Sequence, residues 1–130
     1  MYNEKVISIF QHPKHAGEIR SCSGIGKVGE AEQGDVVKVY LKIEDNVIVQ
    51  AKAKTFGSVA AIVCVDVAMG LISGKTIEQA LEITNQDILD QVGSLPASKK
   101  HSAILAQEAV EDAIRDYRKR QLRATAKAEQ

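Results

Sequence analysis

The chain is poor in cysteine and in aromatic residues, and it has no excess of charge of either sign. Two Cys in 130 residues are too few for a disulfide framework, which argues against a small disulfide-stapled secreted fold. Aromatic residues make up 4% of the chain and Trp is absent, so it lacks the rings on which nucleic-acid bases stack. Lys plus Arg and Asp plus Glu both number 17, and this balance argues against a strongly basic nucleic-acid-binding domain.

Long apolar runs and targeting signals are also missing. The longest apolar region, residues 59–72, is interrupted by Asp66 and Gly70 and is shorter than the roughly 18 residues of a membrane span. The N-terminus has no apolar stretch behind a basic start, so we expect no signal peptide, no membrane partner and a cytoplasmic location. The remaining composition is globular, and we expect one domain over residues 1–123 with a disordered tail over residues 124–130.

The hydrophobic pattern predicts a short helix followed by three strands. Residues 4–10 carry one apolar face and end before Pro13, which lacks the backbone donor that a helix needs. Strands are expected over residues 25–31, 35–44 and 47–56, because apolar and polar side chains alternate in the last two. The residues expected on the apolar face are Val37, Val39, Leu41, Ile43, Val47, Val49, Ala51 and Ala53.

The rest of the chain is expected to be helical and to cover the apolar face of the sheet. Ser58 is placed to cap a nearly all-apolar helix that ends near Ser73, although its β-branched residues leave a strand open over residues 62–67. Two short helices and a long amphipathic helix from about Ser98 to beyond Leu122 follow. This segregation indicates the α+β class: a three-stranded antiparallel sheet covered on one face by helices, with a long C-terminal helix.

Four local strings occur in a characteristic order along these elements. They are His12-Pro13-Lys14-His15-Ala16-Gly17, Gly26-Lys27-Val28-Gly29 followed by Gly34-Asp35, Lys54-Thr55-Phe56-Gly57, and His101-Ser102-Ala103-Ile104-Leu105-Ala106. Together with the order of elements, they resemble the IscU/NifU N-terminal family of iron–sulfur cluster assembly scaffold proteins. The resemblance spans residues 4 to about 117 and implies the IscU/NifU-like fold and a role in cluster assembly.

The same resemblance implies three cluster-ligand cysteines, and this chain has other residues at all three positions. Gln33 stands where the family has a cysteine before Gly-Asp, Ser58 where a cysteine follows Lys-Thr-Tyr-Gly, and Ser102 where a cysteine follows His. Cluster ligands are usually thiolates, whereas serine hydroxyl and glutamine amide groups are neutral and are not soft ligands. The family's supporting Asp and His are present as Asp35 and His101.

These replacements leave three functions open. The first is a degenerate scaffold-family protein, not an enzyme, that binds a cysteine desulfurase or another cluster-assembly protein as an adaptor or regulator. The alternative is a protein that binds or delivers zinc or iron through Asp35 and His101, with Cys22 or water completing the coordination shell. Assembly of an iron–sulfur cluster through unusual ligands, or at a dimer interface, has the least chemical support.

One further segment resembles a recognition motif of the same family. Residues 95–99 stand where the family has the Leu-Pro-Pro-Val-Lys motif that its dedicated chaperone binds, and Leu95, Pro96 and Lys99 match it. The second proline, which helps to hold such a segment extended, is Ala97 in this chain. These three matching residues are the candidate partner-binding residues.

Several of these residues also have purely structural interpretations. Ser58 and Ser102 suit helix caps, and Asp35 suits a turn or a strand start. Cys64 lies inside the apolar helix, where a free cysteine behaves as a small hydrophobic residue. Asp66 is the only charge in that helix, so we expect it to face water or to pair with a cation.

Overall fold

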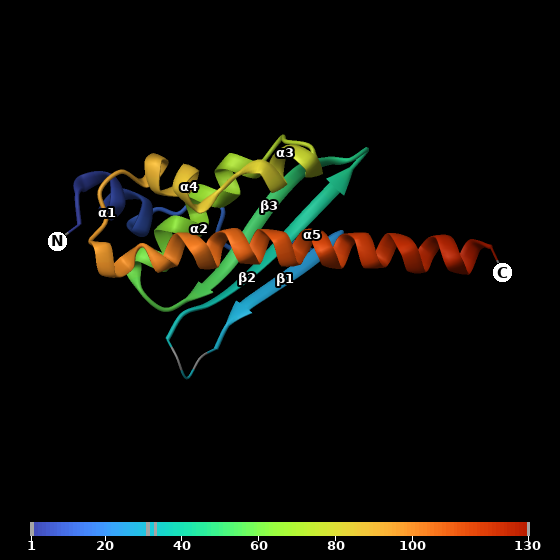
Figure 1. Ribbon diagram of the computed structural model, residues 1–130, viewed down its shortest axis with the longest axis horizontal. Helices are drawn as coiled ribbons and strands as arrows, with labels where there is room; N and C mark the ends of the chain where they lie inside the picture. The colour runs from blue at the N-terminus through green and yellow to red at the C-terminus, as the bar shows by residue number, and fades with distance from the viewer. Residues whose placement is uncertain (1, 31, 33, 130) are drawn as a thin grey trace.

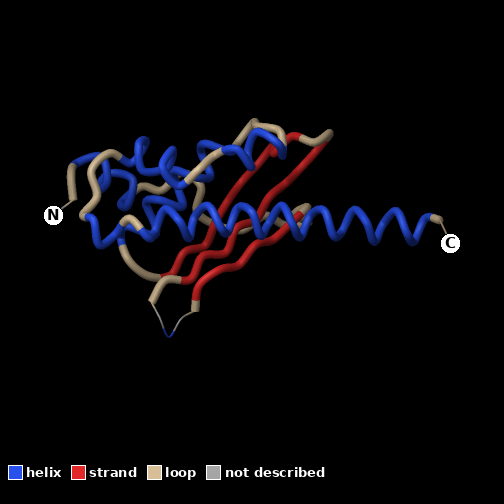
Figure 2. Tube along the Cα trace, in the orientation of Figure 1, coloured by secondary structure: helices blue, strands red, loops and turns tan. Residues whose placement is uncertain are grey.

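A three-stranded antiparallel sheet in the order β1-β2-β3 is covered on one face by helices, within residues 2–30, 32 and 34–129 that the computed structural model describes (Figure 1). The two layers are distinct when the trace is coloured by secondary structure (Figure 2). This arrangement confirms the α+β class expected from the sequence. The elements are α1 (Glu4–Gln11), β1 (Gly24–Gly29), β2 (Val36–Glu44), β3 (Val47–Phe56), α2 (Val59–Ile72), α3 (Ile77–Glu82), α4 (Asn85–Val92), a 3₁₀ turn (Ala97–Lys99) and α5 (His101–Ala128).

The hairpin of β2 and β3 contains a bulge that changes which side chains face the core. A register shift follows Lys42, whose partner is Gln50. The next residue, Ile43, pairs with Ile48 and leaves Val49 as the extra residue of the bulge. Val49 was predicted on the apolar face but is 48% exposed, whereas Ile48 is fully buried. Ala51 and Ala53 are buried as predicted, whereas Val47 and Val49 were placed on the wrong face, because the extra residue puts the side chains before the bulge out of phase with those after it.

Helix α2 is the central helix, and it packs against both β3 and α5. Its buried residues lie all around it: Ala60, Ala61, Val63, Cys64, Val65, Ala68, Met69 and Ile72. The strand alternative over residues 62–67 is therefore wrong, because the helix continues without a break through them. Although α2 is this apolar, none of the helices among the described residues combines the length and the apolar character needed to cross a bilayer.

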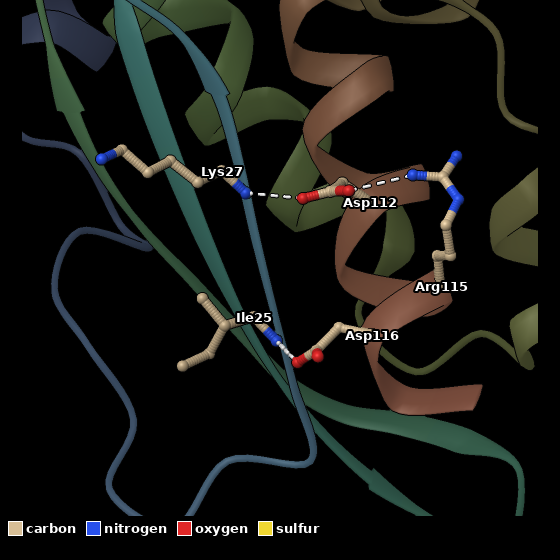
Figure 3. Close-up of polar contacts among 5 residues, drawn as sticks. All are labelled: Ile25, Lys27, Asp112, Arg115 and Asp116. Atoms are coloured by element: carbon tan, nitrogen blue, oxygen red, sulfur yellow. Dashed lines mark hydrogen bonds and ion pairs between the residues drawn. The ribbon is translucent and has the colours of Figure 1, made fainter. Parts of the chain in front are cut away.

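Helix α5 crosses β1 at very close range. A Cβ atom at Gly26 would collide with backbone atoms of α5, so only glycine allows the two backbones to approach this closely. The carboxylates of Asp112 and Asp116 accept hydrogen bonds from the backbone N–H groups of Lys27 and Ile25, both at 2.9 Å (Figure 3). These bonds satisfy two donors at the outer edge of the sheet, which would otherwise be open for pairing with another strand.

Both ends of α5 differ from the sequence-based expectation. The 3₁₀ turn over Ala97–Lys99 precedes it, so α5 begins at His101 rather than near Ser98. At the other end α5 continues to Ala128, so the stretch expected as a disordered tail is helical as far as that residue. The three Ala and the one Lys of residues 124–128 are good helix formers, although the side chains there are exposed and this end of α5 projects beyond the sheet (Figure 1).

Candidate functional site

The best-defined polar contact among the predicted site residues joins Asp35 to Ser58. The backbone N–H of Ser58 donates to Oδ1 of Asp35 at 2.7 Å, and the Ser58 hydroxyl donates to Oδ2 at 3.3 Å. The same hydroxyl accepts from the N–H of Ala61 at 3.1 Å, which makes Ser58 the N-cap of α2. The predicted cap is confirmed, and the fold brings two of the predicted site residues into direct contact.

The residues on either side of this contact explain why it forms. Val36 begins β2 and pairs with Phe56 at the end of β3, so the chain that leaves β3 toward α2 passes beside Asp35. Gly57 makes this passage with φ +140°, and a Cβ there would collide with the Asp35 carboxylate. The carboxylate also lies at the N-terminus of α2, where the helix dipole favours negative charge.

His101 and Ser102 occupy the start of α5 but do not join this hydrogen-bond network. The side chain of His101 is exposed, whereas Ser102 is only 4% exposed. Lys100 takes the cap position of α5, and no side chain caps this helix. The prediction that Ser102 is a cap was therefore wrong, because the preceding 3₁₀ turn shifts the helix start and places Ser102 inside the first turn.

The segments that carry the predicted site residues lie toward one end of the molecule. The end of β1, the start of β2, the β3–α2 connection and the start of α5 are all at that end (Figure 1). Gln33, which follows β1 in the sequence, lies outside the described residues. Among the residues that are described, no group of three or more His, Cys, Asp or Glu side chains is arranged to hold a metal ion.

The two cysteines have different surroundings, and neither belongs to a metal-ligating group within the described ranges. Cys64 is fully buried in α2 as expected, and this burial raises the pKa of its thiol to about 12. At neutral pH the thiol of Cys64 is therefore protonated and is a poor ligand. Cys22, by contrast, is half-buried, and its backbone carbonyl accepts a hydrogen bond from Arg120 of α5 at 2.9 Å.

Sequence reasoning missed the role of Asp66. Its Oδ1 accepts a hydrogen bond from the backbone N–H of His15 at 2.8 Å, so it ties the loop after α1 to α2 instead of facing only water or pairing with a cation. His15 and Asp66 together line two neighbouring cavities of about 450 and 540 Å³. The isolated charge in an apolar helix was the available signal, but the sequence does not show which backbone group it meets.

The segment that resembles a chaperone-binding motif is divided between core and surface. Leu95 is buried and belongs to the hydrophobic core, whereas Pro96 and Lys99 are exposed at the 3₁₀ turn. The backbone N–H of Lys99 donates to the carbonyl of Pro96 at 2.8 Å, so this stretch is turned rather than extended.

An α+β fold with the candidate site residues on the β1–β2 connection, the β3–α2 connection and the start of α5 is also found in a known protein family. Residues 1–124 match the model of the NifU-like N terminal domain, and the chain belongs to this family. It is 42% identical over 117 residues to the iron–sulfur cluster assembly scaffold protein IscU 1 of Archaeoglobus fulgidus, a match that covers 90% of this chain and 76% of the relative. It is 41% identical to the iron–sulfur cluster assembly protein IscU of Plasmodium falciparum over 93% of this chain and 76% of that protein.

Other relatives extend this similarity to longer proteins and to solved structures. The nitrogen fixation protein NifU of Nostoc is 35% identical over 90% of this chain, which matches only 42% of that longer protein. The crystal structure of the N-terminal part of a nitrogen-fixing NifU-like protein from Brucella abortus superposes with a TM-score of 0.69. That superposition covers 90% of this chain and 94% of the other at 18% identity, so it supports the fold alone.

Proposed function

We propose that this member of the cluster-assembly scaffold family acts as a partner-binding adaptor or regulator, without a catalytic step and without holding a cluster through the family's ligand set. The observation that carries the proposal is the side chain at the second ligand position. Ser58 has its hydroxyl engaged as the cap of α2 and as a donor to Asp35. An alcohol in these contacts is stable as a structural group and is a poor substitute for a soft thiolate.

The other candidate ligands also fit a cluster poorly. Ser102 carries a neutral hydroxyl group, and the residue is buried in the first turn of α5 with only 4% of its surface exposed. The buried thiol of Cys64, with its pKa raised to about 12, offers no replacement. Since iron–sulfur clusters are held mainly by thiolates, no step of cluster chemistry is assigned to these residues.

The retained framework is what a partner would recognise. The sequence similarity to scaffold proteins covers almost the whole chain, whereas the three cluster-ligand positions predicted from the resemblance carry Gln33, Ser58 and Ser102. This pattern favours binding to a cysteine desulfurase or another cluster-assembly protein, in the cytoplasm. Such a protein would compete with an active scaffold for the same partner or alter the partner's turnover.

The test compares the natural chain with a variant in which the three thiols are restored, Gln33→Cys with Ser58→Cys and Ser102→Cys. Both proteins are titrated against a purified cysteine desulfurase, and desulfurase turnover is measured in parallel. Both are also incubated anaerobically with iron and sulfide. We expect both to bind, and only the restored variant to develop a visible cluster chromophore that survives desalting. If the natural chain neither binds the desulfurase nor changes its turnover, the adaptor role is excluded.

The metal-binding alternative rests on Asp35 and His101. Both oxygens of Asp35 already accept hydrogen bonds from Ser58, so a metal ion would have to compete with these contacts. Elemental analysis of protein purified without chelator distinguishes the two functions. Near-stoichiometric zinc or iron that is lost on His101→Ala would support the alternative, whereas metal-free protein supports the adaptor.

A further inference from the structure

Three lysines stand directly opposite one another on the sheet. The register pairs Lys27 of β1 with Lys38 of β2, and Lys38 with Lys54 of β3. Residues directly opposite in neighbouring strands point to the same face, so the three ammonium groups form a row across the whole sheet. Figure 3 shows the Lys27 side chain directed away from α5, which places the row on the face that the helices leave uncovered.

This row of lysines is only partly neutralised by the protein itself. Lys54 forms an ion pair with Glu18 at 3.1 Å, and the Lys38 ammonium lies 5.4 Å from the centre of the Tyr40 ring. Among the described residues, Glu18 is the only carboxylate in ion-pair distance of any of the three lysines. Like charges placed directly opposite in a sheet are destabilising, so the row weakens the fold that carries it.

An apolar row adjoins the lysine row on the same face. Val36 pairs with Phe56, two residues along each strand from Lys38 and Lys54. Phe56 is 69% exposed, and it lines an open cavity of about 710 Å³ with Val36 and Lys27, which Glu30 and Glu32 border on the side of the β1–β2 connection. A cationic row beside an exposed ring is complementary to a protein surface that presents carboxylates next to an apolar side chain.

The mixture of charges around the row favours an acidic protein over a nucleic acid as the occupant. The chain has a formal net charge of +0, and carboxylates lie close to the row: Glu18 pairs with Lys54, and Glu30 and Glu32 line the cavity beside Phe56. These carboxylates would repel a uniform polyanion such as DNA, whereas a protein surface can place its acidic groups over the lysines alone. Two further lysines on the same face, Lys42 and Lys52, extend the positive field beyond the row.

We propose that Lys27, Lys38 and Lys54, together with Val36 and Phe56, form a docking face for a partner protein that carries an acidic surface with an apolar side chain. Val36 directly follows Asp35, and Phe56 is separated from Ser58 by one residue, so a protein docked there reaches the edge of the candidate site. The docking face goes beyond the proposed adaptor role, and it is tested without a desulfurase.

The experiment measures binding of two synthetic peptides, one of alternating Glu and Phe and one of alternating Glu and Ser. Lys38→Glu replaces the centre of the row, and Lys119→Glu on the exposed surface of α5 makes the same change in net charge as a control. Because a glutamate at the centre of the row would repel the peptide carboxylates, Lys38→Glu should lower affinity for both peptides by roughly tenfold or more. Lys119→Glu should change it less than about twofold. Phe56→Ser should weaken only the Phe-containing peptide.

A second variant keeps the test informative if the charge reversal disturbs folding. Lys38→Thr removes the central charge and relieves the like-charge contacts, so its melting temperature should rise while its affinity for both peptides falls. Equal losses for Lys38→Glu and Lys119→Glu would overturn the proposal, as would unchanged peptide affinity in Lys38→Thr. Tighter binding of a DNA duplex or of anionic lipid vesicles than of the Glu-Phe peptide, at the same salt concentration, would also overturn it.

Discussion

Replacing Gly26 by alanine tests the close approach of α5 to β1 with the smallest available change. The added Cβ would overlap the carbonyl oxygen of Ala109 and the backbone nitrogen of Ala113. Backbone atoms of a long helix cannot rotate away as a flexible side chain does, so α5 as a whole must move off the strand. Gly26 does not have a positive φ, and the effect is therefore steric rather than conformational.

The magnitude follows from what the displacement breaks. Moving α5 outward lengthens the hydrogen bonds from Lys27 N to Asp112 and from Ile25 N to Asp116, both 2.9 Å. Hydrogen bonds to charged groups contribute about 1.5–3 kcal/mol each, and overpacking alone costs about 1–3 kcal/mol. Partial loss of both bonds with the overpacking gives a destabilisation of roughly 3 kcal/mol or more, a large share of the ~5–15 kcal/mol typical of a domain.

Urea denaturation followed by far-UV circular dichroism measures this effect, since the chain has no Trp to report by fluorescence. A loss of about 3 kcal/mol should lower the urea midpoint by about 1–3 M. Gly70→Ala is the matched control: its Cβ would lie 3.4 Å from Nε2 of His15, an ordinary contact, and it should stabilise α2 by about 0.5–1 kcal/mol. If Gly26→Ala stays within about 0.5 kcal/mol of the natural chain, the close approach of α5 to β1 is refuted.

Three further results are expected. Ser58→Ala should destabilise the protein by about 0.5–2 kcal/mol through loss of the α2 cap, measured by the same urea titration, and an unchanged midpoint would contradict the cap. The hydrogen bond and charge of Lys54 lower the pKa of Glu18 in the folded protein, so this pair stabilises the fold at pH values above the unfolded pKa of 4.5, and the stabilisation is lost as the pH falls below it. Glu18→Gln should therefore make the free energy of unfolding less dependent on pH in acid. An identical pH profile of stability in the variant would argue against the pair. A thiol reagent should modify Cys22 in the native protein and Cys64 only after unfolding, because burial raises the Cys64 pKa to about 12; rapid reaction of native Cys22→Ser protein would contradict this burial.

Local patterns predicted the fold wherever one side chain type decides the outcome. The alternation over β2 was sufficient, because its two faces differ clearly in character, whereas the all-apolar run of α2 left a strand open over residues 62–67. The bulge at Val49 was not predictable from the sequence. Val47, Ile48 and Val49 are all apolar, and only the pairing register with β2 decides which of them faces the core. The start of α5 was placed too early because the 3₁₀ turn before it has the same local composition as a helix start.

The sequence indicated one pair of the candidate site residues but not the contacts between them. The resemblance selected Asp35 and Ser58 as residues of one site, and the structure places them within hydrogen-bond distance. Nothing in the spacing of these residues indicates that both carboxylate oxygens are occupied by one serine. The contact between Asp66 and the backbone of His15 likewise joins residues 51 apart in the sequence, beyond the reach of any local pattern.

Because the ribosome makes the chain from the N-terminus, β1 is synthesised well before the part of α5 that covers it. Ile25 and the carboxylate that receives its N–H are 91 residues apart in the sequence. At about 5–20 residues per second, synthesis of β1 precedes synthesis of Asp116 by about 5–20 s. During this interval the strand has been made but its edge has no cap, and the surface around Gly26 has no helix over it. A nascent chain shorter than about 116 residues therefore presents an unprotected strand that only the last quarter of the protein can close.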